Sequence, residues 1–392
     1  MLFISHSLLL ESPIVKSQHT PLSDVRRNFR VKWYRSPIER GTLVELMRRS
    51  NLQGAFQAVG HLALWAVTGL LSYYLFKQQY WVGFAIALFL HGTVGSFFRG
   101  LAVHELSHGT VFKTKWLNHF FLYIYSILAW WNYHEYAMSH TYHHRYTLHP
   151  EGDREVVLPR NPTLLVMYLL QLFTVNITFR TESNGIIPVF QRILWTAFHR
   201  YDGEWLKALY EQQPEARRQA VNWSRFLIVF HLVLITIFVT IGEPILVVLV
   251  SGHIFIGNWL KYFVGLPMHC SLQDNVPDFR KCVRTITLNP ISEFLYWHMN
   301  WHTEHHMFAG VPCYNLAKLH NAVKNDMPKP RTLVGAWREM RETWRRQRDD
   351  PDYQFDTPLG PSAQPAVAHA VEARDDDSLE SSIGDLAPKA LS

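Results

Sequence analysis

The stretch "HLALWAVTGLLSYYLFKQQYWVGFAIALFLHGTVGSFF" at residues 61–98 decides the fold. A helix needs about 20 largely apolar residues to cross about 30 Å of hydrocarbon. Residues 56–76 meet this requirement, and residues 81–98 meet it at the short limit. The link at 77–80 has room only for a tight turn, so we predict a transmembrane hairpin that returns the chain to its starting side.

A second hairpin is predicted over residues 226–241 and 244–266. Only Gly242 and Glu243 separate these two apolar runs. Pro244 stands at the start of the second helix, where its missing N–H costs no hydrogen bond. This hairpin also returns the chain to the side from which it came.

Two further apolar stretches, 117–131 and 164–179, are short for a crossing. If the second crossed alone, the histidines before and after it would face opposite compartments. We therefore place both in the membrane interface, although a buried apolar helix explains either equally well. The expected fold is an all-α integral membrane protein with four transmembrane helices in two hairpins, interfacial helices and a cytosolic helical cap.

The rest of the chain divides by composition. Residues 1–55 form a basic arm, which the positive-inside tendency keeps in the cytosol. Its first fifteen residues lack the basic start and the small-residue cleavage site of a signal peptide, so we expect a loose arm. Residues 56–350 form the membrane domain. Residues 351–392 are rich in Pro, Ala, Ser and Asp and are predicted to be disordered.

Charge and cysteine content narrow the class of protein. The net charge is +6, and the basic residues flank apolar blocks, which indicates an anionic membrane surface and no nucleic-acid partner. Three cysteines give no disulfide framework and fit a reducing cytosolic face.

Three histidine clusters carry the chemistry: "HELSH" at 104–108, "HTYHH" at 140–144 and "HTEHH" at 302–306. Spacings of three and four put imidazoles on one helical face, about 5–6 Å apart. Alone, H-E-x-x-H is the signature of a zinc peptidase in which Glu105 activates water. The clusters contain eight candidate ligands, too many for one zinc ion, which takes four. Imidazole also suits iron, copper and nickel. The eight are His104, His108, His140, His143, His144, His302, His305 and His306.

The predicted topology brings the three clusters to one face of the membrane. His269 follows the last crossing and is a ninth candidate ligand, although a lone histidine also suits a hydrogen-bonded boundary position. Ligand histidines usually donate their second N–H to a carboxylate or carbonyl that fixes the tautomer. The nearby candidates for this role are Glu105, Asp153, Asn300 and Glu304. Histidines inside the crossings are predicted to be core residues: His61, His91, His231 and His253.

The set HxxxH, HxxHH and HxxHH, with the ending "HTEHHMFAGVP", resembles the membrane fatty acid desaturase and hydroxylase superfamily over about residues 56–330. The resemblance implies four spanning helices topped by a cytosolic helical cap that carries the histidines. It also implies two irons that use O2 and external electrons. The ligands it implies are the eight box histidines, with His269 matching a further family histidine, and residues 56–350 become a desaturase-like catalytic domain.

This chain departs from the family pattern in three places. Gly265 stands where some relatives have an iron-binding Asn, and Ala309 replaces the usual Pro after the third box. The chain also lacks the fused haem domain of some relatives. Electrons are therefore expected from a separate carrier, either cytochrome b5 or a ferredoxin with its reductase.

The expected function is desaturation of an acyl or lipid-like chain. Hydroxylation of a lipid or hydrophobic secondary metabolite is the alternative, and the sequence does not decide between them. A zinc peptidase built on HELSH and a non-catalytic metal-binding membrane protein are alternatives of other classes. The expected location is the endoplasmic reticulum in a eukaryote or the inner membrane in a bacterium, with the histidines on the cytosolic side.

Overall fold

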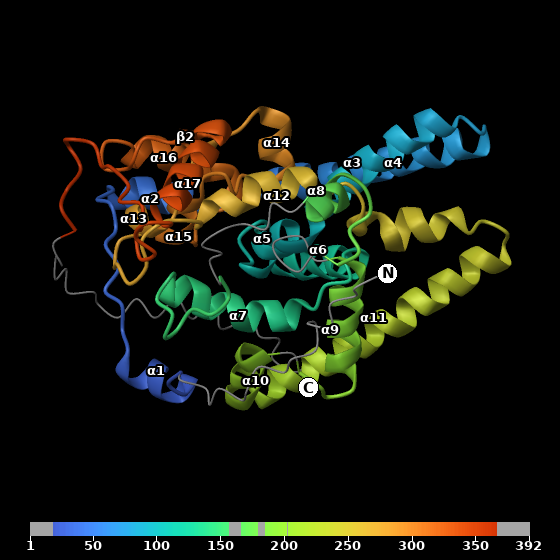
Figure 1. Cartoon of the computed structure of the whole chain (residues 1–392), viewed down its shortest axis with the longest axis horizontal. Coiled ribbons are helices and arrows are strands. Elements are labelled where there is room, and N and C mark those ends of the chain that lie inside the picture. Colours follow the sequence, from blue (N-terminus) through green and yellow to red (C-terminus); the bar gives the residue numbers. More distant parts are fainter. Residues whose placement is uncertain (1–18, 157–165, 179–184, 202, 367–392) are drawn as a thin grey trace, which may run out of the picture.

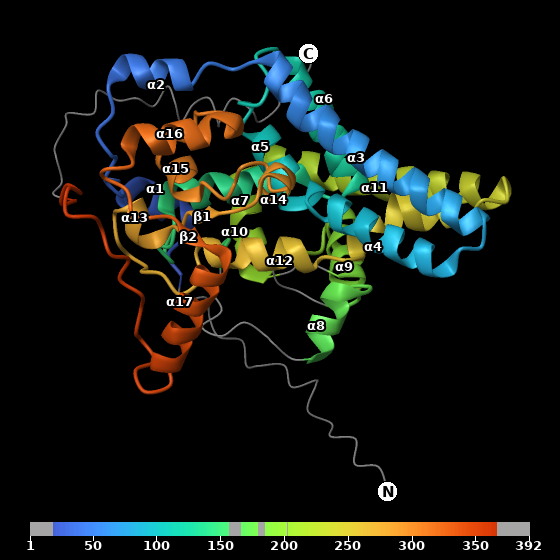
Figure 2. The ribbon, with the colours of Figure 1, turned by 90° about the horizontal axis from the view of Figure 1, so that it is seen from above.

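The computed structural model describes residues 19–156, 166–178, 185–201 and 203–366 of the 392-residue chain. The loose arm predicted over the first fifteen residues lies outside the described residues, as does the predicted disorder of 367–392. The described chain is almost entirely helical. Long helices project from one side of a larger assembly of short helices, which we call the helical body (Figures 1 and 2).

Three long apolar stretches project from the body: α3 (Asn51–Lys77), a stretch over 81–107, and α11 (Pro214–Thr240). Each has 27 residues, and within the described ranges these three are long and apolar enough to cross a membrane. Continuous exposed apolar surface of this kind suits contact with lipid. More than half of the side-chain surface is exposed at several large apolar residues, among them Val67, Leu70, Val82, Ile86, Val229 and Leu232.

The first two long stretches form the predicted hairpin, with α3 and α4 side by side (Figure 1). The second is interrupted, because α4 (Trp81–Ser96) gives way to the irregular turn η1 (Phe98–Ala102) before α5 (Val103–Ser107). Gly100 in this turn has a φ of 77°, a conformation that glycine adopts without steric cost. The kink redirects α5, which carries His104, into the helical body.

The region of the fourth predicted crossing differs from a single helix over 244–266. The chain instead forms three short pieces: η2 (Val247–Gly252), η3 (His253–Phe255) and α12 (Trp259–Gly265). Gly257, with a φ of 60°, breaks the path between the last two. The Asn258 side chain donates a 2.8 Å hydrogen bond to the Ile254 carbonyl, a backbone acceptor that the break leaves without a helical partner.

The helical body consists of short helices joined by loops. Before the third long stretch it contains α1 (Leu22–Asn28), α2 (Arg40–Leu46), α6 (Lys115–Leu128), α7 (Tyr133–Tyr146), α8 (Val166–Phe173), α9 (Ile186–Ala197) and α10 (Gly203–Gln212). After that stretch it adds η4 (Leu266–Met268), α13 (Phe279–Cys282), α14 (Pro290–Leu295), α15 (His302–Met307), η5 (Cys313–Asn315), α16 (Leu316–Val323) and α17 (Leu333–Arg346). The short strands β1 (Ile286–Thr287) and β2 (Arg331–Thr332) pair in parallel.

The two stretches predicted to lie in the interface are short helices with one exposed apolar face. Trp116 of α6 is 63% exposed, whereas Tyr125 of the same helix is fully buried. Likewise, Met167 of α8 is 66% exposed and Leu172 is fully buried. Such two-faced helices suit a position at the membrane surface.

The first part of the C-terminal tail differs from the disorder predicted for 351–392. Residues 351–366 pack on the helical body, where the Arg280 guanidinium donates to the Gln364 carbonyl at 2.9 Å. The Gln364 N–H in turn donates to the Asp326 carboxylate at 2.7 Å. The buried Arg280 thus holds in place a segment whose own composition favours disorder. The prediction missed this order because it comes from residues far away in the sequence.

Close packing between α4 and the broken fourth region gives a first prediction. A Cβ added at Gly92 would lie 2.4 Å from the Ile256 carbonyl oxygen, so Gly92→Ala forces the two segments apart. We expect this variant to lower the free energy of unfolding by about 1–3 kcal/mol. Thermal unfolding in detergent, followed by tryptophan fluorescence, measures the change.

Gly83→Ala on the same helix is the matched control. Its added Cβ would lie 3.5 Å from Leu75, an ordinary contact, and alanine favours the helix by about 0.5–1 kcal/mol. We therefore expect this variant to be as stable as the wild type or slightly more so. Equal unfolding temperatures for the two variants would contradict the close approach at Gly92.

Candidate metal centre

The structure brings all nine predicted histidines together inside the helical body. Four segments deliver them: α5 with its C-terminal neighbour, α7, α15, and the turn after η4. Eight of the nine are buried and His144 is partly exposed. Because the four segments are distant in sequence, only their packing creates the centre.

The nine histidines form two groups within the described part of the chain. In each group, one ring nitrogen per residue lies within 4.8 Å of the others. The five-histidine group contains His104, His108, His140, His144 and His305. The four-histidine group contains His143, His269, His302 and His306.

The two helices that carry an HxxHH cluster, α7 and α15, contribute to both groups. Each gives its first and last histidine to one group and its middle histidine to the other. Around a helix, residues i and i+4 lie about 40° apart, whereas residue i+3 lies about 60° to the other side of i. The five-histidine group receives His140 and His144 from α7 and His305 from α15. The four-histidine group receives His302 and His306 from α15 and His143 from α7. Each helix therefore holds both groups, which joins them into one centre.

Within each group, the Nε2 atoms of neighbouring histidines lie close together. They are 3.0 Å apart between His302 and His269, and 3.2 Å apart between His302 and His306. In the five-histidine group the separations are 3.3 Å for His140 and His108 and 3.2 Å for His305 and His144. Nitrogens about 2.1 Å from one metal ion at right angles lie about 3 Å apart. The donor set therefore fits one metal ion in each group.

Burial favours the neutral form of most of these imidazoles, and neutral imidazole is the form that binds metals. Loss of solvation lowers the pKa of His108 and of His269 to about 3. The same cause, aided by neighbouring imidazoles, lowers the pKa of five others well below the ordinary value: His140, His144, His302, His305 and His306. The centre thus presents lone pairs and little positive charge at neutral pH.

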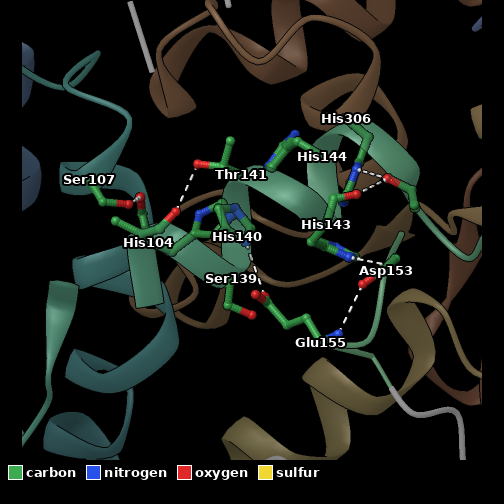
Figure 3. A network of polar contacts seen from close by, with 12 residues as sticks. His104, Ser107, Ser139, His140, Thr141, His143, His144, Asp153, Glu155 and His306 are labelled. Atoms are coloured by element: carbon green, nitrogen blue, oxygen red, sulfur yellow. Dashed lines mark hydrogen bonds and ion pairs between the residues drawn. The ribbon is translucent and has the colours of Figure 1, made fainter. Parts of the chain in front are cut away.

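Asp153 is the best-placed of the predicted partner residues. It is buried and accepts a 2.8 Å hydrogen bond from Nδ1 of His143 (Figure 3). The backbone N–H groups of Leu148 and Glu155 also donate to it, each at 3.0 Å. Burial raises the pKa of Asp153, but the His143 contact and the two N–H donors outweigh this and hold that pKa below its ordinary value. The carboxylate therefore stays charged and turns Nε2 of His143 toward the four-histidine group.

Glu105 accepts a hydrogen bond from Nδ1 of His104 at 2.8 Å. Its carboxylate also lies 3.7 Å from Nδ1 of His305, so that it sits between two members of the five-histidine group. This position behind the imidazoles suits orientation of ligands rather than activation of a water molecule.

Three further partners were missed in the sequence. The Glu155 carboxylate faces Nδ1 of His140 at 3.1 Å (Figure 3), and burial raises its pKa to about 7. The Thr147 hydroxyl lies 3.1 Å from Nδ1 of His306, and the Cys282 carbonyl accepts from Nδ1 of His269 at 3.2 Å. Glu155 and Thr147 follow HTYHH closely, which is a usable signal, whereas a backbone carbonyl leaves none in the sequence.

Asn300 and Glu304 make their described hydrogen bonds to groups other than the nine histidines. The Asn300 amide donates to the Ile286 carbonyl at 3.1 Å. The Glu304 carboxylate receives 2.6 Å hydrogen bonds from the Thr285 hydroxyl and from Nδ1 of His320. Their described hydrogen bonds therefore fix the position of α15 and its neighbouring segment instead of orienting one of the nine imidazoles.

The four histidines inside the long apolar region have ordinary structural partners. Each ring contacts a backbone carbonyl oxygen at 2.8–3.0 Å: His61 with Val94, His91 with Leu249, His231 with Ile127 and His253 with Val250. This agrees with their prediction as core residues.

Comparison with known families bears directly on the centre. The family model described as fatty acid desaturase matches residues 78–337, more than half of the chain, and its match contains all three histidine clusters and His269. A comparison with curated proteins found no match. The resemblance inferred from the clusters is therefore confirmed, and this chain belongs to the fatty acid desaturase family.

Proposed function

We propose that the protein is a multi-pass membrane oxidase that uses two irons, O2 and external electrons to introduce a double bond into an acyl or lipid-like chain. One observation carries this proposal, namely the convergence of nine buried imidazoles into two joined groups. Membership of the fatty acid desaturase family supports the acyl substrate. A peptidase built on HELSH would leave the four-histidine group without a role.

The two groups are the proposed iron ligands, five imidazoles on one side and four on the other. When bound, two irons supply the oxidising power, drawn from O2, that an unactivated C–H bond requires. The chain's own residues keep the imidazoles neutral and oriented, with Asp153, Glu155 and Glu105 accepting the second N–H groups.

Desaturation also determines how many electrons and protons the protein must receive for each O2. The substrate loses two hydrogen atoms, and two electrons and two protons come from outside, so that one O2 becomes two water molecules. We propose cytochrome b5, or a ferredoxin with its reductase, as the electron donor. A lipid-like substrate reaches the centre from the bilayer in which the long helices stand.

In the proposed membrane arrangement, α3 and α4 form the first hairpin, and α11 with the broken 244–266 region forms the second. The helices α6 and α8 lie in the interface, and the helical body is the cytosolic cap. Residues 1–55 are the cytosolic arm, 56–350 the catalytic domain and 351–392 the tail. The location is the endoplasmic reticulum or the bacterial inner membrane, according to the source.

Metal analysis and lipid analysis test the function together. The purified protein is expected to contain about two irons per chain, in keeping with two separate nitrogen-donor sets. Expression in a host of known lipid profile, followed by mass spectrometry, should reveal a product two hydrogens lighter than a host lipid. A product heavier by one oxygen identifies a hydroxylase instead. One zinc per chain and no lipid product would contradict the proposal.

A further inference from the structure

The N-terminal arm contacts segments that flank the four-histidine group. The backbone N–H of Tyr34 donates to the Pro277 carbonyl at 2.9 Å, next to α13. The Arg35 guanidinium donates to the Met307 carbonyl at the end of α15, and the Tyr34 hydroxyl donates to Asp326 at 2.9 Å. These contacts fix the arm on the helix that carries the third histidine cluster.

Trp33 of this arm begins a continuous line of ring contacts that ends at an iron-ligand candidate. Its ring stacks on Phe279 with centroids 4.0 Å apart and an interplanar angle of 10°. The Phe279 ring lies 5.7 Å from that of His306. Since Trp33 is partly exposed and both other rings are buried, the line runs from the protein surface to the four-histidine group.

A second line of contacts joins the same two ends. The Trp33 and His149 rings form an edge-to-face contact with their centroids 5.3 Å apart. Nδ1 of His149 donates to the Thr147 carbonyl at 3.0 Å. The Thr147 hydroxyl lies 3.1 Å from Nδ1 of His306. Two lines of contact therefore connect Trp33 with His306, and groups spaced this closely favour electron transfer between them.

The surface around Trp33 is strongly basic. Between residues 24 and 35 the chain has a single acidic residue, Asp24, against five exposed basic residues, which are Arg26, Arg27, Arg30, Lys32 and Arg35. Clusters of one sign attract partners of the opposite sign and raise their association rate. We call residues 24–35 the basic arm surface.

The basic arm surface faces away from the apolar hairpins. In Figure 1 the arm runs from α1 toward α2 along one end of the molecule, and the tips of α3, α4 and α11 lie at the opposite end. An acidic soluble protein can reach this end, whereas an anionic lipid headgroup on the plane of the bilayer would meet the other.

We propose that an acidic one-electron carrier protein docks on the basic arm surface and delivers its electrons through Trp33 to His306. This inference rests on the proposed function, because only a redox centre needs such a donor. Each docked carrier would lose one electron, iron held by the four-histidine group would accept it, and two carriers in succession would supply the two electrons of one turnover. No atom is transferred with the electron.

Binding is tested first, because it requires neither iron nor substrate. The full-length protein is placed in nanodiscs of neutral lipid, and the oxidised soluble domain of cytochrome b5 and a plant-type ferredoxin are tested separately by interferometry. The charge reversal Arg30→Glu with Lys32→Glu is expected to weaken binding of the preferred carrier about tenfold at low salt. Wild-type binding should weaken steeply as salt is added.

Arg338→Glu with Arg341→Glu is the matched control. Both residues are exposed on α17, another basic helix of the body, and the double variant makes the same change in charge. We expect its carrier affinity to stay within about twofold of the wild type. An equal or larger loss in this control, or no loss in the arm variant, would overturn the proposed location. Binding of the wild type that appears only in nanodiscs with anionic lipid would also overturn it.

Electron transfer is tested second, by anaerobic stopped-flow mixing of reduced carrier with oxidised, iron-loaded protein. At saturating carrier, where the rate no longer depends on affinity, Trp33→Leu should slow the limiting rate at least tenfold, and Trp33→Phe, which keeps an aromatic ring, should retain most of the wild-type rate. Each rate is divided by the rate of dithionite reduction of the same variant. A Trp33→Leu rate equal to wild type contradicts the electron path. If dithionite reduces neither the wild type nor the variants, the proposed function itself is contradicted.

Discussion

His302→Ala is expected to abolish lipid oxidation and to lower the iron content from about two to about one per chain. His302 has two close partners in the four-histidine group, because its Nε2 lies 3.0 Å from that of His269 and 3.2 Å from that of His306. Its loss removes one of only four donors there. Loss of a metal that contributes about 4 kcal/mol to catalysis slows turnover about a thousandfold. Iron analysis and mass spectrometry of host lipids measure both effects.

His199→Asn is the control for this variant. His199 is exposed, lies outside both groups and has a φ of 57°, a backbone conformation that asparagine tolerates. We expect its iron content and lipid product to match those of the wild type. A His302→Ala protein with full iron content and normal product would show that the four-histidine group is not a metal site. One zinc that survives this substitution would favour the peptidase.

Asp153→Asn should have the second largest effect, because it removes the charge that fixes His143. The carboxylate accepts from Nδ1 of His143 at 2.8 Å, so that Nε2 would be the ring nitrogen that binds a metal. Asparagine keeps the shape but can present its NH2 group to the imidazole, which favours the wrong tautomer. Substitution of such partners lowers metal affinity or activity about 10- to 100-fold.

Competition with a chelator measures the affinity of Asp153→Asn for iron, and lipid analysis measures its activity. Asp274→Asn is the matched control, since Asp274 lies on a partly exposed loop and hydrogen-bonds the neighbouring Asn275 at 3.3 Å. We expect the control to bind iron as the wild type does. Equal chelator sensitivity of the two variants would mean that Asp153 only stabilises the loop around it.

The grouping of the histidines could be predicted from the sequence where the signal was local. The spacings of three and four within HELSH, HTYHH and HTEHH place imidazoles on one side of a turn wherever the helix lies. The prediction was weaker for the residues that orient them. Asp153 and Glu105 accept hydrogen bonds from two of the nine histidines, whereas Glu304 accepts them from Thr285 and His320. Proximity in sequence does not say in which direction a carboxylate points.

The membrane-related predictions show the same division. The α3–α4 hairpin follows from composition alone, since more than twenty apolar residues have few alternatives to a long helix. The region after α11 is equally apolar but contains Gly257 and Asn258, and its backbone finds partners outside a helix. In particular, the Asn258 side chain accepts from Asn176 at 2.9 Å, a contact between segments far apart in sequence. A mean hydropathy over the apolar run hides the contribution of Gly257 and Asn258, so it does not reveal that the helix is broken there.

By itself, the sequence determined that the chain is helical, that it contains long apolar stretches, and that clustered histidines of this family's pattern are present. These properties follow from composition and from spacing along one helix. Only the tertiary structure decided how the nine imidazoles divide, with His143 leaving its cluster for one group and His305 leaving its cluster for the other. The physical reason is that a helix fixes which residues share a face, but the packing of four segments fixes what each face meets.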